Sequence, residues 1–201
     1  MPSPLVIRGA RPQALPMTTS DSDLTESPCP GEWRSQSLAR LVAHLSDRYR
    51  SPTELCLDAL SDLFLRPRWT GKPSEPVYER GIEAFTTLEQ QVRAHMALED
   101  NLLIPLALAL EHPELVSVRR SRVECEELIT KALDDHQRIE RSIDMLERSI
   151  RPLVMVALFQ PQEQRLVLDD VTTLALLLRE QMALEDKCLW PRAMELFRVL
   201  D

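Results

Sequence analysis

The chain has 201 residues and a formal net charge of −8, which argues against nucleic acid as a partner. No apolar run reaches the roughly 18 residues that a membrane span requires, and the N-terminus lacks the apolar core of a secretory signal, so we expect a cytoplasmic protein. Only four glycines and 4% aromatic residues, with abundant leucine, alanine, glutamate and arginine, predict an all-helical protein.

The four cysteines stand singly along the chain and form no Cys-x-x-Cys pair, which gives little support to a zinc site or a redox pair. We expect reduced and mostly buried thiols at Cys56, Cys125 and Cys188. The remaining cysteine, Cys29, lies in the N-terminal stretch.

Residues 1–32 are rich in proline, serine and threonine and lack apolar periodicity. We interpret them as a flexible tail ahead of a folded domain at residues 33–201. The first helix is expected to begin near Ser35 or Ser37, either of which can cap it. A capping-box pattern with proline at the first helical position begins at Ser51, so the helix can kink and restart there. Residues 66–75 are expected to form a loop.

Three further helices are predicted, at about 77–111, 117–150 and 162–198. Pro105 and Pro191 lie inside the second and fourth helices, where a proline kinks or locally breaks the helix. His112 is expected in a surface turn, and residues 151–161 form an apolar connection that packs over one end. Long helices with short connections predict an antiparallel up-down four-helix bundle.

A repeated sequence organises the chain. Residues 95–105 read HMALEDNLLIP, and residues 181–191 read QMALEDKCLWP. Each copy places a glutamate four residues after its first position, so His95 shares a helix face with Glu99, and Gln181 shares one with Glu185. Both pairs fall on stripes that otherwise consist of leucine and valine: Leu88, Val92, His95, Glu99, Leu102 and Leu106, and Leu174, Leu178, Gln181, Glu185 and Leu189.

A carboxylate on a buried stripe needs a cation, a hydrogen-bond network or a metal ion. Solvated acids at a partly exposed edge are the simpler reading of one such stripe, but its repetition favours a built site. His136 also lies on an apolar line of the third helix, with Ile129, Leu133, Ile139, Ile143, Leu146 and Ile150. It precedes Gln181 by 45 residues, and 45 residues before His95 stands Arg50. If the bundle is a duplicated helix pair, Arg50 is therefore the counterpart of His136.

The acids next to these positions are expected to face away from the site. Asp100 and Asp186 directly follow the two glutamates and point off the stripe. Asp134 and Asp135 precede His136, where one of them can orient the imidazole, although exposure is the simpler reading for both.

These residues resemble those of the hemerythrin-like (HHE) domain, and specifically the di-iron family that repairs iron–sulfur clusters (repair of iron centres). His95-x-x-x-Glu99 resembles the first His-x-x-x-Glu motif of that family, and His136 resembles its third-helix histidine. Gln181-x-x-x-Glu185 resembles the second motif with its histidine replaced. The resemblance covers about residues 33–198, whereas the cysteine-paired N-terminal module of the family has no counterpart.

The resemblance implies a four-helix bundle with two non-haem irons, bridged by Glu99 and Glu185 and completed by His95 and His136. It also implies a role in the response to nitrosative or oxidative stress, with a client iron–sulfur protein as partner. Arg50 and Gln181 stand where the family has histidines. A glutamine oxygen can ligate weakly, but a guanidinium has no lone pair to offer and instead neutralises carboxylates.

Two hypotheses follow. In the first, the chain is a metalloprotein with a reduced site that holds one iron or a weakly bound pair through His95, Glu99, His136, Glu185 and Gln181. In the second, it is a metal-free structural or interaction module in which Arg50 neutralises Glu99 and Glu185. Nothing in the sequence requires enzymatic activity.

Overall fold

The computed structural model describes residues 29–64, 76–111, 122–155 and 161–200, and all regular structure in these ranges is helical. The elements are α1 (Gly31–Arg34), α2 (Leu38–Leu45), η1 (Ser46–Arg50), α3 (Ser51–Phe64), α4 (Pro76–Leu98), η2 (Glu99–Leu103), α5 (Ile104–Glu111), α6 (Arg122–Met155), α7 (Pro161–Leu184), η4 (Glu185–Leu189) and α8 (Trp190–Leu200), where η marks a π-helical segment. The predicted all-helical class is therefore confirmed.

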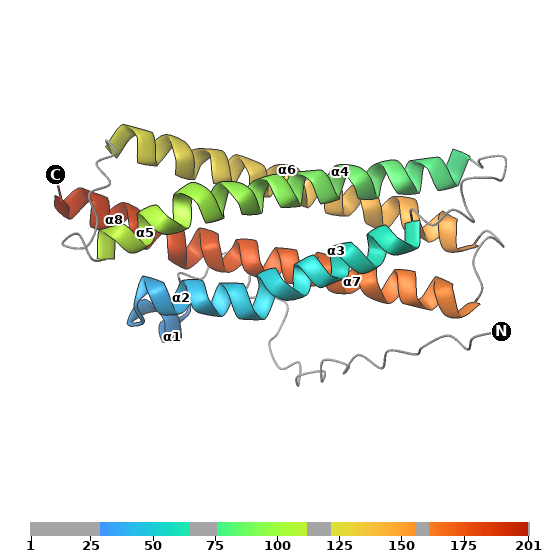
Figure 1. Ribbon diagram of the computed structural model, residues 1–201, viewed down its shortest axis with the longest axis horizontal. Coiled ribbons are helices and arrows are strands. Elements are labelled where there is room, and N and C mark those ends of the chain that lie inside the picture. Colours follow the sequence, from blue (N-terminus) through green and yellow to red (C-terminus); the bar gives the residue numbers. More distant parts are fainter. Residues whose placement is uncertain (1–28, 65–75, 112–121, 156–160, 201) are drawn as a thin grey trace, which may run out of the picture.

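The long helices lie side by side along one axis, with α1, α2, α5 and α8 gathered at one end (Figure 1). Helix α4 packs mainly against α6, and α7 packs against both α3 and α6. No helix in the described ranges is both long enough and apolar enough to cross a membrane.

Two large groups of buried apolar side chains lie on either side of a polar layer. One group, which includes Leu60, Phe85 and Leu174, fills the space between α3, α4, α6 and α7. The other includes Leu41, Leu103 and Trp190 and fills the end where α2, α5 and α8 meet. Met96 and Met182 belong to the first group, as expected of core methionines. The polar layer between the two groups contains the repeated His/Gln and Glu residues.

The first helix begins as predicted, but it continues where a restart was expected. Ser37 caps α2, and its side chain accepts a hydrogen bond from the backbone N–H of Arg40 at 3.1 Å. At Ser51 the chain passes without a break from η1 into α3, so the expected restart with a capping box is wrong. The helix absorbs Pro52 through the π-helical segment that precedes it.

The predicted bounds of about 77–111 and 162–198 agree with the structure to within two residues, while the predicted start of the third helix near 117 lies outside the described residues. The end of the third helix differs. Helix α6 extends to Met155 and contains Pro152, so residues 151–155 are helical rather than part of a connection. The expected loop over residues 66–75 and the turn at His112 lie outside the described residues.

A disulfide joins Cys29 to Cys188, 159 residues apart, so the expectation of a reduced thiol at Cys188 is wrong. Cys56 and Cys125 remain thiols, as expected. The disulfide holds the residues directly before α1 against η4, and Cys29 is itself almost completely buried. The end of the predicted tail is thus attached to the bundle. Because disulfides are typical of oxidising compartments, this bond weighs against a cytoplasmic location, which stays a prediction.

Candidate metal centre

Three π-helical segments position the polar layer, and each is followed by a proline. Segments η1, η2 and η4 end at Arg50, Leu103 and Leu189, and in each case a proline stands two residues later, at positions 52, 105 and 191. Each segment also has a backbone N–H that bonds to the carbonyl five residues earlier. A proline removes one helical donor and crowds the preceding turn, and a wider turn accommodates both effects. Such π-bulges occur frequently at functional sites.

The functional side chains lie at the ends of these segments. Arg50 is the last residue of η1, while Glu99 and Glu185 are the first residues of η2 and η4. His95 and Gln181 stand one turn earlier on the same helices. His136 comes from the middle of α6, which packs against both α4 and α7. All six side chains are at least 93% buried.

Four ligand-type atoms converge from His95, Glu99, His136 and Glu185, all within 4.8 Å of one another. The two Nε2 atoms of the histidines are 3.0 Å apart. Nε2 of His95 is 3.4 Å from Oε1 of Glu99, and Nε2 of His136 is 3.2 Å from Oε2 of Glu185. Both of these carboxylate oxygens are buried, and neither has a partner with hydrogen-bond geometry in the described structure. Two histidines and two acids thus point their coordinating atoms at one small volume.

Arg50 and Gln181 bind the opposite oxygens of the two glutamates. Arg50 donates from Nη1 to Oε2 of Glu99 at 2.7 Å, and its Nη2 donates to the carbonyl of Met96 at 3.0 Å. Gln181 donates from Nε2 to Oε1 of Glu185 at 2.8 Å. Each glutamate therefore has one oxygen held by a neighbouring donor and one oxygen directed at the shared volume. The carbonyl oxygen of Gln181 is buried without a partner and remains available as a ligand.

Acidic side chains also face the outer nitrogens of both histidines. Asp186 lies 2.6 Å from Nδ1 of His136, close enough for a strong hydrogen bond. Asp135 lies 3.9 Å from Nδ1 of His95, and it is ion-paired with both Lys131 and Arg138. A carboxylate on the outer nitrogen fixes the tautomer and the ring orientation of a metal-binding histidine. His136 is therefore held directly, whereas His95 is approached by a carboxylate that two cations share.

The titration of the site reflects its burial and its charges. Burial alone would raise the pKa of Glu99, but nearby His95 and the charges of Arg50 and His136 lower it overall. Burial and the repulsion of Glu99 raise the pKa of Glu185. Burial works to lower the pKa of His136, but contact with Asp186 and Glu185 outweighs it and raises the pKa to about 10. The metal-free centre thus keeps a proton between His136 and Glu185 at neutral pH, and metal ligation requires its release.

Two surface grooves reach the centre from opposite faces of α6. A groove of about 240 Å³ ends at His95 and is lined by Lys131, Asp135 and Arg138. A wider groove of about 480 Å³ ends at His136 and is lined by Arg179 and Asp186 among others. Because both histidines are nearly inaccessible to solvent, these grooves provide approach only for small molecules or ions.

The sequence placed the six principal residues correctly and misplaced several of their neighbours. His95, Glu99, His136, Gln181, Glu185 and Arg50 all lie in the buried layer. Arg50 contacts Glu99 and the partly exposed Asp100, whereas Glu185 contacts Gln181 and His136. The expectation that Arg50 neutralises both glutamates therefore holds for Glu99 and is wrong for Glu185.

Asp186, Asp100 and Asp135 are the functional neighbours that the helical pattern missed. Asp186 was expected to point away, yet it contacts His136; Asp100 contacts Arg50, and Asp135 is 9% exposed. The first two lie in π-helical segments, in which side chains are rotated relative to an α-helix. The prolines six residues after each glutamate were the available signal. Asp134 is exposed, as expected.

Comparisons with models of protein families, with curated proteins and with solved structures give no match to this chain. The identity of the site therefore rests on its own chemistry: a buried group of His95, Glu99, His136 and Glu185 that could hold a metal ion.

Proposed function

We propose that the chain is a hemerythrin-like protein, an antiparallel up-down four-helix bundle that binds one non-haem iron ion through His95, Glu99, His136 and Glu185. The observation that carries the proposal is the pair of buried carboxylate oxygens, one from each glutamate, that have no hydrogen-bond partner and face two imidazole nitrogens. A carboxylate oxygen that is buried without a hydrogen-bond partner is costly to the extent that neighbouring charges do not balance it. A metal ion in the volume between these four atoms removes that cost.

The spacing of the donors supports a single ion. A tetrahedral ion with bonds of about 2.1 Å separates neighbouring ligand atoms by about 3.4 Å. The three short separations here, between the two histidines and from each histidine to its nearest glutamate, are 3.0, 3.4 and 3.2 Å. The other three separations are within 4.8 Å, so the four donors converge on a volume suited to one ion.

The nature of the donors supports iron and argues against a second ion. Two imidazoles with carboxylates suit iron among the first-row metals. The outer oxygen of Glu99 is occupied by Arg50, and that of Glu185 by Gln181. A guanidinium cannot ligate a metal, so the position that Arg50 occupies is closed to a second iron. When bound, iron would supply redox chemistry at a site held by His95, Glu99, His136 and Glu185.

The biological role follows from the resemblance described above. It suggests that this centre takes part in the repair of iron–sulfur clusters or in the response to nitrosative and oxidative stress, with a client iron–sulfur protein as partner. The two surface grooves that end at His95 and His136 are consistent with small reactive molecules reaching such a centre.

Metal content tests the proposal. The protein is loaded anaerobically with Fe(II), freed of excess metal, and measured by plasma mass spectrometry together with its optical spectrum. We expect about one iron per chain, lost on Glu185→Gln but retained on the matched change Glu195→Gln, which alters an exposed glutamate of α8. Loaded wild-type protein that retains no iron would refute the proposal.

A second candidate, the metal-free module, is favoured by one observation. Arg50 already neutralises Glu99, and the raised pKa of His136 places a positive charge beside Glu185, so the buried acids are balanced without an ion. In that case iron and strong chelators would leave the thermal unfolding temperature unchanged. Stabilisation by iron that a chelator reverses would exclude this alternative.

A further inference from the structure

The disulfide is attached to the same π-helical segment that supplies a proposed metal ligand. Cys188 stands three residues after Glu185 within η4, and both are buried to 99% or more. Its partner, Cys29, directly precedes Pro30 and α1. The bond therefore links the first of the described residues to the backbone turn that positions Glu185.

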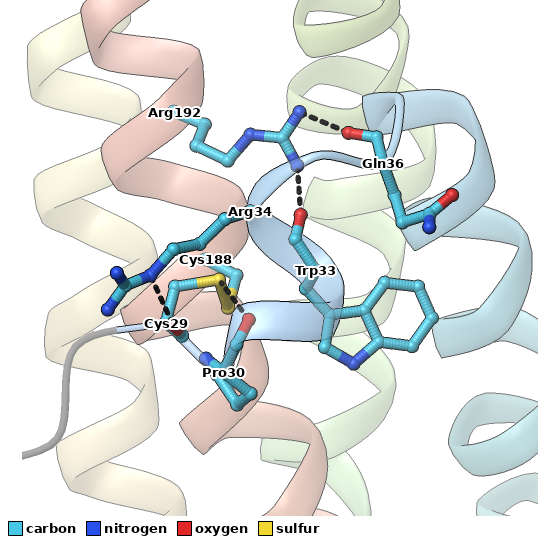
Figure 2. Close-up of a disulfide and its surroundings, with 7 residues drawn as sticks. All are labelled: Cys29, Pro30, Trp33, Arg34, Gln36, Cys188 and Arg192. Carbon is cyan, nitrogen blue, oxygen red and sulfur yellow. Dashed lines mark hydrogen bonds between the residues drawn. A yellow bond between two sulfur atoms is a disulfide. The ribbon is translucent and has the colours of Figure 1, made fainter.

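Further contacts fasten the same N-terminal segment to the end of the bundle (Figure 2). Within the segment itself, Arg34 donates from Nε to the carbonyl of Cys29 at 2.8 Å. Arg192, from α8, donates to the carbonyls of Trp33 and Gln36 at 3.0 and 2.5 Å. The segment thus lies against η4 and α8 as a clasp, which we define as residues 29–37. The disulfide is its covalent attachment to η4.

The clasp also reaches the helix that carries Arg50. The ring centroids of Trp33 and His44 are 4.5 Å apart. The ring of His44 also forms a T-shaped contact with Tyr49, the neighbour of Arg50 in η1. A π-helical turn is rare and is held in place by its surroundings. Here the clasp is joined to η4 by the disulfide, and it reaches η1 through the ring contacts of Trp33, His44 and Tyr49.

We propose that the Cys29–Cys188 disulfide is a redox-dependent lock on the metal centre, so that its reduction lowers the affinity of the centre for metal. This inference rests on the proposed function and adds a means of regulating it. In the oxidised chain the clasp holds η4 with Glu185 directed at the histidines. In the reduced chain residues 29–37 separate from η4, and Glu185 loses its fixed direction.

The switching step is a thiol–disulfide exchange with a dithiol reductant. A thiolate of the reductant attacks the sulfur of Cys29, because Cys29 is 9% exposed whereas Cys188 is fully buried. The Cys29–Cys188 bond breaks, Cys188 leaves as a thiolate and takes up a proton, and a mixed disulfide forms. The second thiol of the reductant then displaces Cys29. Two electrons and two protons pass to the cysteine pair, and the reductant becomes a disulfide.

The test compares the affinity for Co(II), an optical probe that replaces iron, in oxidised protein and in protein reduced with a trialkylphosphine. We expect affinity to fall roughly tenfold or more on reduction, the size of effect typical when support of a metal ligand is lost. Cys29→Ser should bind Co(II) as weakly as the reduced wild type in both conditions. Cys56→Ser, which alters a thiol outside the disulfide, should respond to reduction as the wild type does.

Hydrogen exchange keeps the inference testable if the chain binds no metal. The backbone amides of residues 185–190 should exchange faster after reduction, while those in the middle of α6 stay unchanged. Absence of Co(II) binding in both states would refute the proposed function and, with it, the effect of reduction on metal affinity. Faster exchange at 185–190 in that case would leave only the hold of the disulfide on η4. Equal Co(II) affinity or equal exchange in the two states would overturn the lock, and so would loss of helical circular dichroism throughout the chain on reduction.

Discussion

Replacing Arg50 by alanine tests whether the polar layer depends on its buried cation. The side chain of Arg50 is 8% exposed, and its guanidinium lies 2.7 Å from Glu99, which is completely buried. Removing one partner of a buried ion pair leaves an uncompensated charge and costs about 3–5 kcal/mol. We therefore expect the metal-free Arg50→Ala variant to lose about that much free energy of unfolding.

Arg93→Ala is the matched control, because it removes an arginine that also forms two ion pairs. The side chain of Arg93 is 44% exposed and contacts Asp58 and Glu89. Exposed ion pairs contribute about 0–1 kcal/mol, since water solvates the partners when the pair is broken. The two variants thus differ in burial while the chemistry of the substitution is the same.

The assay is urea unfolding of both variants and the wild type, followed by circular dichroism in the presence of a chelator. The unfolding free energy should fall with urea concentration at the same slope in all three proteins, so that the midpoints report stability alone. The deficit of Arg50→Ala should shrink as the pH falls, because Glu99 without its arginine takes up a proton more readily and the buried charge disappears. A loss below about 1 kcal/mol, equal to that of Arg93→Ala, would refute the reasoning.

Three further predictions concern the ligands and their supports. Asp186→Asn should lower the affinity for Fe(II) about 10–100-fold, because it weakens the contact that orients His136. The control is Asp100→Asn, at the matching place in the repeat, which should change the affinity little in the same titration. The double variant Arg50→His with Gln181→His should raise iron content above one per chain by plasma mass spectrometry; unchanged content would contradict the correspondence with the histidine positions of the family. The metal-free protein should lose stability as pH rises from 6.5 toward 10, because the pKa of His136 is raised to about 10 in the folded state. Protonated His136 stabilises the fold fully only below the pKa of 6.5 that it has in the unfolded chain, and this stabilisation disappears as pH approaches 10. Urea midpoints that stay flat across this window in wild type, or that fall equally in His136→Gln, would contradict that assignment.

The sequence was sufficient to predict which polar residues are buried together, because two kinds of regularity coincided. Periodicity of three and four placed His95, Glu99, Gln181 and Glu185 on buried stripes, and all four are buried. The offset of 45 residues then identified Arg50, which donates to Glu99. These inferences used only helical geometry and the internal repeat.

Local changes of helical register account for the side chains that were misplaced. The apolar stripe of the second helix was expected to pass through Leu102. Instead Leu103 is only 1% exposed, because η2 adds an extra residue to the turn. The contact of Asp186 with His136 has the same origin in η4. In α6 the expected core residue Leu133 is 36% exposed and its neighbour Ala132 is fully buried. Nothing in the structure explains why Ala132 is buried in place of Leu133 in a regular α-helix.

The disulfide could not be predicted, because nothing local relates its two cysteines. Cys29 and Cys188 are 159 residues apart, and only the packing of the clasp against η4 brings them together. The pairing is a property of the tertiary structure alone, and the single spacing of the cysteines in the sequence pointed to thiols instead.

The bond between Cys29 and Cys188 converts most of the chain into a covalent ring. Closing a loop of this length lowers the conformational entropy of the unfolded chain, which raises its free energy by about 5 kcal/mol in the simplest model. His95, Glu99, His136 and Glu185 all lie within the ring. An oxidised chain that unfolds therefore keeps these four side chains on one closed loop, where their mutual distances stay bounded. A reduced chain has no such bound, so the same cysteine pair also influences how readily the centre reassembles.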